Sequence, residues 1–297
     1  SLKIGSLGNI YDIAGNPNLL SCEVASLKTT LNVAVYNDES GTNLGCTACS
    51  GLTCGGTVGG VAGQNGTFTG DAIVQNLADL AWLKNVVNLT GSMTVDRSGL
   101  TTISGLSNLR AIGVDLTISN NASLSDVNGL NGLQSVTRNF NIQTNALTNV
   151  NGLSALTGVG GSFQIFNNAL LGNVGGLTAL ATVGDYVNIQ SNSVLANLDG
   201  LSNLTSVGAQ PVNSAGYLQV SSNGALTSIL GLLRPTTGKL GFLGGYLTVS
   251  NNGQLSSCQA DALKAALVTA QGWNKVYTNT NNITCTSPKA CAGAVCQ

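Results

Sequence analysis

The chain has 297 residues, of which 43% are hydrophobic and only 8% are charged, with 11 basic side chains, 12 acidic side chains and no histidine. This length and apolar content can bury a sizeable core, which excludes disorder, and the near-zero net charge gives no electrostatic footprint for nucleic acid or an anionic membrane surface. Without histidine, Ser-His-Asp and Cys-His catalysis and histidine-bearing zinc sites are excluded.

Eight cysteines gather at the two ends of the chain, and none lies between residues 54 and 258. An even number in Gly/Ser/Thr-rich segments favours disulfides formed in an oxidising compartment over metal binding or the redox chemistry that Cys-Thr-Ala-Cys spacing would allow. We therefore expect an extracellular protein with no metal. The cysteines are Cys22, Cys46, Cys49, Cys54, Cys258, Cys285, Cys291 and Cys296.

Residues 1–54 repeat the spacing of the C-terminal end. Leu19, Cys22, Leu27 and Leu31 match Leu255, Cys258, Leu263 and Leu267 one for one, and Cys46 then corresponds to Cys285. Among the connectivities that the sequence allows, this match favours Cys22–Cys46 and Cys258–Cys285, with Cys49–Cys54 and Cys291–Cys296 as small local loops. The chain starts at Ser1 without a signal peptide, which suggests a mature, processed or excerpted product.

A Gly-rich linker is predicted over residues 55–70, and an amphipathic helix follows in the sequence GDAIVQNLADLAWLKNVV. Its apolar face would contain Ile73, Val74, Leu77, Leu80 and Val87. This helix would cap the N-terminal end of a domain that spans residues 71–297. No segment is apolar for long enough to span a bilayer.

A repeat of about two dozen residues decides the fold. The dipeptide Gly-Leu recurs at Gly105, Gly129, Gly152, Gly176 and Gly200, with spacings of 24, 23, 24 and 24, and returns at Gly231. Each copy contains an apolar-polar-apolar strand, such as Leu116 to Ile118, and then apolar residues at every third position. Stacked copies predict a mainly β, right-handed parallel β-solenoid with short capping helices and terminal disulfides.

One asparagine column follows the strands: Asn16, Asn121, Asn145, Asn168, Asn192, Asn223 and Asn252, with Ser98 as the exception. It could be an exposed ligand ladder, but we favour a ladder that satisfies backbone groups at a corner. The outward strand positions form a second column: Thr94, Thr117, Asn141, Gln164, Asn188, Gln219 and Thr248. The mixed lengths of its side chains argue against ice binding, and the lack of aromatic platforms argues against sugar binding. We therefore favour the interpretation that this column is ordinary solvated surface.

Frames such as LTISNNASLSDVNGLNGLQSV and VNIQSNSVLANLDGLSNLTSV resemble the receptor L-domain, a relative of leucine-rich repeats. This family occurs in insulin- and growth-factor-receptor ectodomains and in fungal and microbial cell-surface proteins. The resemblance covers about residues 66 to 285 and implies an extracellular solenoid. Residues 1–54 then resemble the closing end of a preceding L-domain. This piece could pack on a neighbouring copy, fold back on its own domain, or belong to a longer tandem chain.

Two insertions interrupt the frame, between Val207 and Leu218 and between Leu232 and Leu247. Both are expected to bulge side by side at one corner, where they form either a binding surface or tolerated loops. The candidate contacts are Gln210, Asn213, Arg234, Thr237 and Lys239.

Glycosylation sequons occur at five asparagines. The expected glycosylation sites are Asn65, Asn88, Asn203 and Asn282, and Asn65, Asn88 and Asn282 are the better acceptors because they are expected outside the regular coils. Asn121 belongs to the inner column and should stay unmodified. Together these features favour a non-enzymatic structural or adhesive protein that assembles head to tail at the cell surface, without a cofactor. The alternatives are an ectodomain that binds glycan or protein and, less favoured, ice binding.

Overall fold

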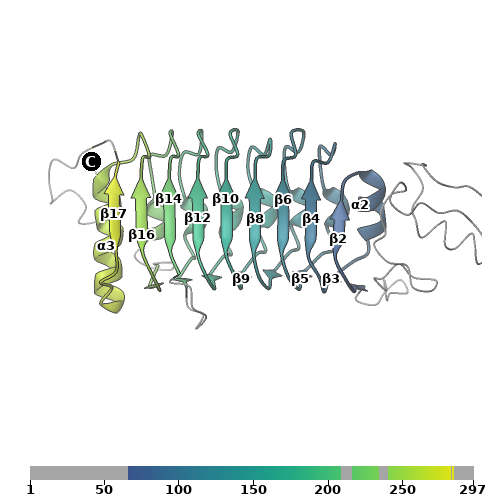
Figure 1. Cartoon of the computed structure of the whole chain (residues 1–297), viewed down its shortest axis with the longest axis horizontal. Coiled ribbons are helices and arrows are strands. Elements are labelled where there is room, and N and C mark those ends of the chain that lie inside the picture. Colours follow the sequence, from purple (N-terminus) through teal and green to yellow (C-terminus); the bar gives the residue numbers. More distant parts are fainter. Residues whose placement is uncertain (1–65, 209–215, 234–239, 282, 284–297) are drawn as a thin grey trace, which may run out of the picture.

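The computed structural model describes residues 66–208, 216–233, 240–281 and 283. They wind into an elongated stack of coils, with α2 (Leu77–Leu83) at the N-terminal end and α3 (Ser257–Gln271) at the C-terminal end (Figure 1). Two sheets run along the stack, and each strand pairs in parallel with strands of adjacent coils. The predicted parallel β-solenoid is confirmed.

The larger sheet has nine strands, one from each coil. Equivalent residues pair from coil to coil, so that Phe163 lies opposite Val187 and Ile165 opposite Ile189. The sheet is therefore a set of columns, each built from one position of the repeat. Its strands are β2 (Ala72–Val74), β4 (Met93–Asp96), β6 (Leu116–Ser119), β8 (Phe140–Gln143), β10 (Phe163–Phe166), β12 (Val187–Gln190), β14 (Leu218–Ser221), β16 (Leu247–Ser250) and β17 (Tyr277–Thr280).

The smaller sheet and a row of 3-10 turns form the other sides of each coil. The eight short strands are β1 (Thr67–Phe68), β3 (Asn88–Leu89), β5 (Ala111–Ile112), β7 (Ser135–Val136), β9 (Gly158–Val159), β11 (Thr182–Val183), β13 (Ser206–Val207) and β15 (Phe242–Leu243). The turns are η1 (Ser104–Leu106), η2 (Asn128–Leu130), η3 (Asn151–Leu153), η4 (Gly175–Leu177), η5 (Asp199–Leu201) and η6 (Leu230–Leu233).

The recurring apolar positions point into one continuous core, as the repeat predicts. In the coil of β10, the side chains of Phe163, Ile165, Leu171 and Val174 are all fully buried. The Phe163 ring also contacts the Phe140 ring of the preceding coil, with a centroid distance of 5.4 Å. Since no coil can bury this face alone, each coil depends on its neighbours for stability.

In the row of 3-10 turns from η2 to η5, the glycine of the repeated Gly-Leu dipeptide allows the coils to approach closely. A Cβ atom added at Gly129, Gly152, Gly176 or Gly200 would lie 1.8 to 1.9 Å from a backbone carbonyl oxygen of the preceding coil. The turns therefore stack backbone against backbone. Glycine recurs there because the packing leaves no room for a Cβ atom, and not because the backbone has an unusual conformation.

The beginning of the solenoid differs from the prediction. Residues Ala72–Val74 form strand β2, which pairs with β4, and the helix begins only at Leu77. Val74 is buried opposite Val95, whereas Ile73 and Leu77, assigned to the buried face of a helix, are 52% and 70% exposed. Pairing with β4 prevails here, because it buries Ala72 and Val74 while completing the hydrogen bonds of the sheet.

The boundary between linker and solenoid also moves. Residues Thr67–Phe68, in the segment expected to be linker, form β1 and pair with β3. Residues 1–65, which include the cap-like piece 1–54 and the rest of the predicted linker, lie outside the described residues.

The C-terminal capping helix is confirmed as α3. Ser256 begins it by accepting the backbone N–H of Cys258 on its side-chain oxygen, and Gly272 ends it in the left-handed conformation, with φ 66°. Leu263 and Leu267 face the core and are fully buried. No helix of the described ranges is both long and apolar enough to cross a lipid bilayer.

Cys258 is disulfide-bonded. The other seven cysteines lie outside the described residues, so the pairing of Cys258 with Cys285 stays a prediction.

Candidate binding surfaces

The asparagine column is a buried ladder, as the favoured interpretation expected. The Asn192 side chain shows the pattern: its Oδ1 accepts the backbone N–H of Asn168 at 3.0 Å, and its Nδ2 donates to the carbonyl of Ile165 at 3.0 Å. Asn281 extends the ladder by one coil, beyond the residues found in the sequence. Of the predicted column, Asn16 lies outside the described residues.

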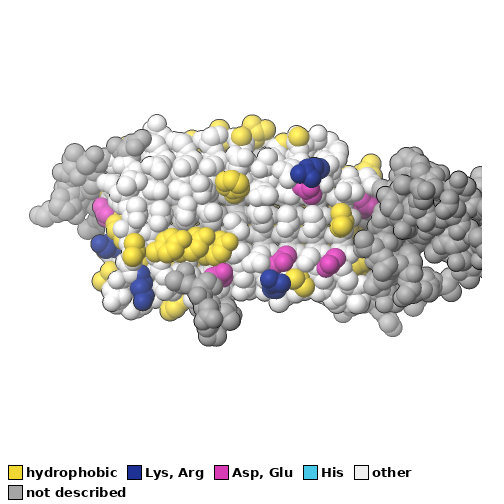
Figure 2. All heavy atoms as spheres, in the orientation of Figure 1, with side chains coloured by type: hydrophobic (Ala, Val, Ile, Leu, Met, Phe, Trp, Pro, Cys, Tyr) yellow, Lys and Arg dark blue, Asp and Glu magenta, His cyan; other side chains and the backbone are white. Residues whose placement is uncertain are grey.

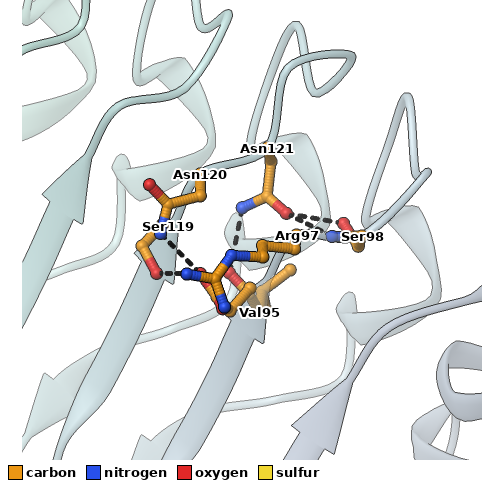
Figure 3. Close-up of polar contacts among 7 residues, drawn as sticks. Val95, Arg97, Ser98, Ser119, Asn120 and Asn121 are labelled. Carbon is orange, nitrogen blue, oxygen red and sulfur yellow. Dashed lines mark hydrogen bonds and ion pairs between the residues drawn. The ribbon is translucent and has the colours of Figure 1, made fainter.

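Ser98 ends the ladder at the N-terminal side. Its backbone N–H and its hydroxyl both donate to Oδ1 of Asn121, at 3.0 and 2.7 Å, while Nδ2 of Asn121 donates to the carbonyl of Val95 (Figure 3). The residue before each ladder position from Ser98 to Asn252 has a positive φ, as at Asn120 with 56°. The side-chain amides of the ladder are therefore occupied by hydrogen bonds to the backbone and are not available to a ligand.

A small polar cluster lies beside the start of the ladder. Asp96 accepts hydrogen bonds from Ser119 and Asn120 and pairs with Arg97 at 3.5 Å. These two hydrogen bonds, with a smaller contribution from the Arg97 charge, lower the pKa of Asp96 below its usual value. Because the Arg97 side chain is 80% exposed, the ion pair contributes little to stability.

The outward strand residues form the expected polar stripe on the nine-stranded sheet. Thr94, Gln164 and Thr248 are all half-buried and lie in one register column. Thr278 continues the stripe in the last coil, whereas the apolar Ile73 occupies this position in the first coil. The stripe presents hydroxyl and amide groups of different lengths with no formal charge.

A further column stands at the corner where each coil enters the larger sheet, one residue before the strand. In the N-terminal half its side chains bond to the next coil: Asp71 accepts the N–H of Ser92 at 2.6 Å, and Asp115 accepts the N–H of Asn139 at 2.9 Å. Asn139 in turn accepts the N–H of Ser162 at 3.0 Å. This half of the column stabilises the stacking of the coils.

The same corner becomes aromatic in three successive coils. Tyr186, Tyr217 and Tyr246 stack with ring centroids 4.3 and 4.5 Å apart and planes within 7° of parallel. Val276, 72% exposed, occupies this position in the last coil. Figure 2 shows an apolar row where these strands begin, near the C-terminal end. We name Tyr186, Tyr217, Tyr246 and Val276 the aromatic row.

The aromatic row places three aromatic side chains next to the polar stripe, where the sequence prediction expected no aromatic platform. The signal was available, because the residue before the strand is tyrosine in three neighbouring copies. The rings cover one another's faces, so along the row the ring edges are the parts left for contact with a ligand. Burial and the neighbouring phenols of Tyr186 and Tyr246 raise the pKa of Tyr217, which keeps this phenol uncharged.

At the C-terminal end, side chains that follow β16 form the hydrogen bonds that the backbone of a further coil would otherwise form. Gln271 donates to the carbonyl of Leu243 at 3.1 Å and accepts its N–H at 3.4 Å, which closes the edge of β15. Gln259 bonds in the same way to Thr227 and Ile229. Trp273 donates to the carbonyl of Gly245. The edges of the smaller sheet and of the turn row are therefore covered at this end.

The two insertions do not share a corner, which contradicts the prediction. The first separates β13 from β14, whereas the second separates η6 from β15. They differ because seven residues are added after the short strand in one coil and five are added before it in the next. The candidate contacts Gln210, Asn213, Arg234, Thr237 and Lys239 all lie outside the described residues.

The sequons have different surroundings. Asn203 is exposed, and its Nδ2 donates to the carbonyl of Thr178 at 2.6 Å. Asn88 belongs to strand β3 and is half-buried, so its expected place outside the regular coils is wrong. Asn121 is fully buried in the ladder. Asn65 and Asn282 lie outside the described residues.

No family model, curated protein or solved structure matches this chain. The resemblance to receptor L-domains therefore stays a prediction from the quoted frames. Within the part of the chain that the structure describes, no three His, Cys, Asp or Glu side chains lie close enough together to hold a metal ion.

Proposed function

We propose that this chain is a non-enzymatic structural or adhesive protein of the cell exterior, and that copies of it associate end to end. The proposal concerns the ends of the solenoid, because a parallel stack has two different ends and a contact between unlike ends repeats from copy to copy. The disulfide at Cys258 supports an oxidising, extracellular setting.

The distribution of exposed apolar side chains carries the proposal. Among the described residues, eight large apolar side chains are exposed, and five of them lie in the first coil or in the C-terminal cap. These five are Ile73, Leu77, Val268, Val276 and Ile283. Exposed apolar side chains at both ends of the stack favour association through these ends. The sides of the rod contain Leu170, Val194 and Phe242.

The low charge of the chain is compatible with such a contact. Only 8% of the residues are charged, and the formal net charge is −1. Figure 2 shows this on one face, where Lys, Arg, Asp and Glu are scattered and sparse. Copies with so little net charge do not repel one another strongly, so modest apolar contacts suffice for association.

A charge placed at one end tests the proposal. Val276→Lys is expected to weaken self-association at least about tenfold, because a lysine ammonium is costly to bury in an apolar contact. Leu170→Lys is the matched control: Leu170 is 56% exposed but lies in the middle of the rod. Sedimentation velocity over a wide concentration range measures both variants. A wild-type chain that stays monomeric at the highest concentration would refute end-to-end association.

The aromatic row favours a second candidate function, recognition of a neutral glycan or a protein. Its phenol edges lie beside Asn188, Gln219 and Thr248 of the polar stripe, which offer hydrogen-bond donors and acceptors without charge. For this candidate, Tyr217→Ala is expected to abolish binding on a glycan array, while Tyr217→Phe retains the stack and part of the affinity. Equal binding by wild type and Tyr217→Ala would remove the row as the site.

A further inference from the structure

The strand that ends the larger sheet, β17, has one edge with which no other described strand pairs. The N–H of Leu247 donates to the carbonyl of Val276 and that of Asn251 to the carbonyl of Thr280, so the backbone groups of alternate residues face β16. Those of Tyr277 and Asn279 point the other way. They have no hydrogen-bond partner among the described residues, whereas the edge of β15 is closed by Gln271.

The first strand of the same sheet, β2, is open at the opposite end. The N–H of Ala72 donates to the carbonyl of Ser92 at 2.8 Å, which turns the groups of Ala72 toward β4 and those of Ile73 outward. The backbone of Ile73 has no hydrogen-bond partner in the described ranges, and the Ile73 side chain is 52% exposed. The two ends of the larger sheet thus offer complementary edges.

Within the described ranges, neither strand contains the residues that usually prevent strand addition. Proteins protect exposed edges with lysine, other charged side chains, proline or a covering element. Strand β2 reads Ala-Ile-Val and β17 reads Tyr-Thr-Asn-Thr, without a charge or a proline in either. The inward side chains of β17 bond to α3, as Tyr277 does to Asp261, so this strand is also held in place.

We propose that β17 of one copy pairs in parallel with β2 of a second copy, with Tyr277 opposite the second copy's Ala72. This inference rests on the proposed end-to-end association and specifies its contact. A second copy supplies a strand of the required direction, and the pairing continues the nine-stranded sheet across the junction. The contact joins unlike ends and leaves one open edge at each end, so it propagates into a filament.

The register follows from the pairing of β4 with β6, where the N–H of Met93 donates to the carbonyl of Asp115. By the same pattern, the N–H of Tyr277 donates to the carbonyl of the second copy's Asp71. The N–H of the second copy's Ile73 donates to the carbonyl of Tyr277, and the N–H of Asn279 donates to the carbonyl of Ile73.

Proline substitutions test the strand pairing. Asn279→Pro removes an N–H that points outward, and Asn279→Ala is the matched control, because it loses the same side-chain bonds to Ser257, Asp261 and Asn281 but keeps the N–H. The proline variant is expected to associate at least about tenfold more weakly than the alanine variant in sedimentation velocity. Thermal unfolding must first show that the two variants melt alike.

A mixing experiment makes the test specific to the two edges. Asn279→Pro blocks the C-terminal edge and Ile73→Pro the N-terminal edge, so each variant alone is expected to be monomeric. Mixed together, they should form a heterodimer that grows no further, because each contributes one intact edge. If wild-type copies associate but Asn279→Pro does so equally well, the strand pairing is wrong and the proposed function stands. If the wild type does not associate, both fail.

Discussion

Asn192→Leu is expected to lower the free energy of unfolding by roughly 2–4 kcal/mol, since it removes the side-chain hydrogen bonds to two buried backbone groups and leaves one of them, an N–H, with no other partner. These groups are the N–H of Asn168 and the carbonyl of Ile165, which Asn192 bonds at 3.0 Å each. Leucine has a similar size, so the lost hydrogen bonds dominate over any cavity. Urea unfolding followed by circular dichroism measures the change.

Asn131→Ala is the control for this prediction. Asn131 is exposed at the end of turn η2, and no hydrogen bond of its side chain exists among the described residues. Its replacement should change the free energy of unfolding by less than about 0.5 kcal/mol. If Asn192→Leu were as mild as Asn131→Ala, the ladder would not be the element that joins the coils at this corner.

Gly152→Ala is expected to cost about 3 kcal/mol, at the upper end of what overpacking usually costs. The added Cβ would lie 1.9 Å from the backbone carbonyl oxygen of Val127, and a backbone atom cannot move aside as a flexible side chain does. The coils on either side of turn η3 must separate to admit the methyl group. A melting temperature lowered by roughly 6–12 °C would show this loss.

Gly99→Ala provides the comparison, because a Cβ at Gly99 would meet no atom within 4 Å. It should leave the melting temperature almost unchanged. Equal melting temperatures for the Gly152 and Gly99 variants would mean that the turn row is not closely packed and that the Gly-Leu repeat has another cause.

The sequence predicts the coils well because the repeat is local and strict. The positions that Gly152 and Asn168 occupy in the repeat hold the same residue type at nearly constant spacing along the chain. Only coils stacked in parallel register bring these equivalent residues into contact. The same reasoning failed at the first coil. There Ile73, Val74, Leu77 and Leu80 fit a helical face, and only pairing with β4 separates strand from helix. The local pattern of apolar residues does not reveal the pairing of β2 with β4.

The functional surfaces were harder to find. The aromatic row was missed because its column begins with Asp, Ser and Asn, and because seven extra residues precede Tyr217. The open edge of β17 was missed for a different reason. Its inward residues, Tyr277 and Asn279, are not aliphatic, since they face Asp261 and Ser257 of α3 and not a further coil. That strand therefore lacks the apolar alternation of the others.

The hydrogen bonds of both sheets run along the axis of the rod, which determines how it responds to tension. A force that pulls the two ends apart acts on the interface between one coil and the next, and each interface is made of the same short set of bonds. Such a rod yields by peeling from an end. Each released coil of about 24 residues adds roughly 80 Å of extensible chain, so the protein would lengthen in steps under load.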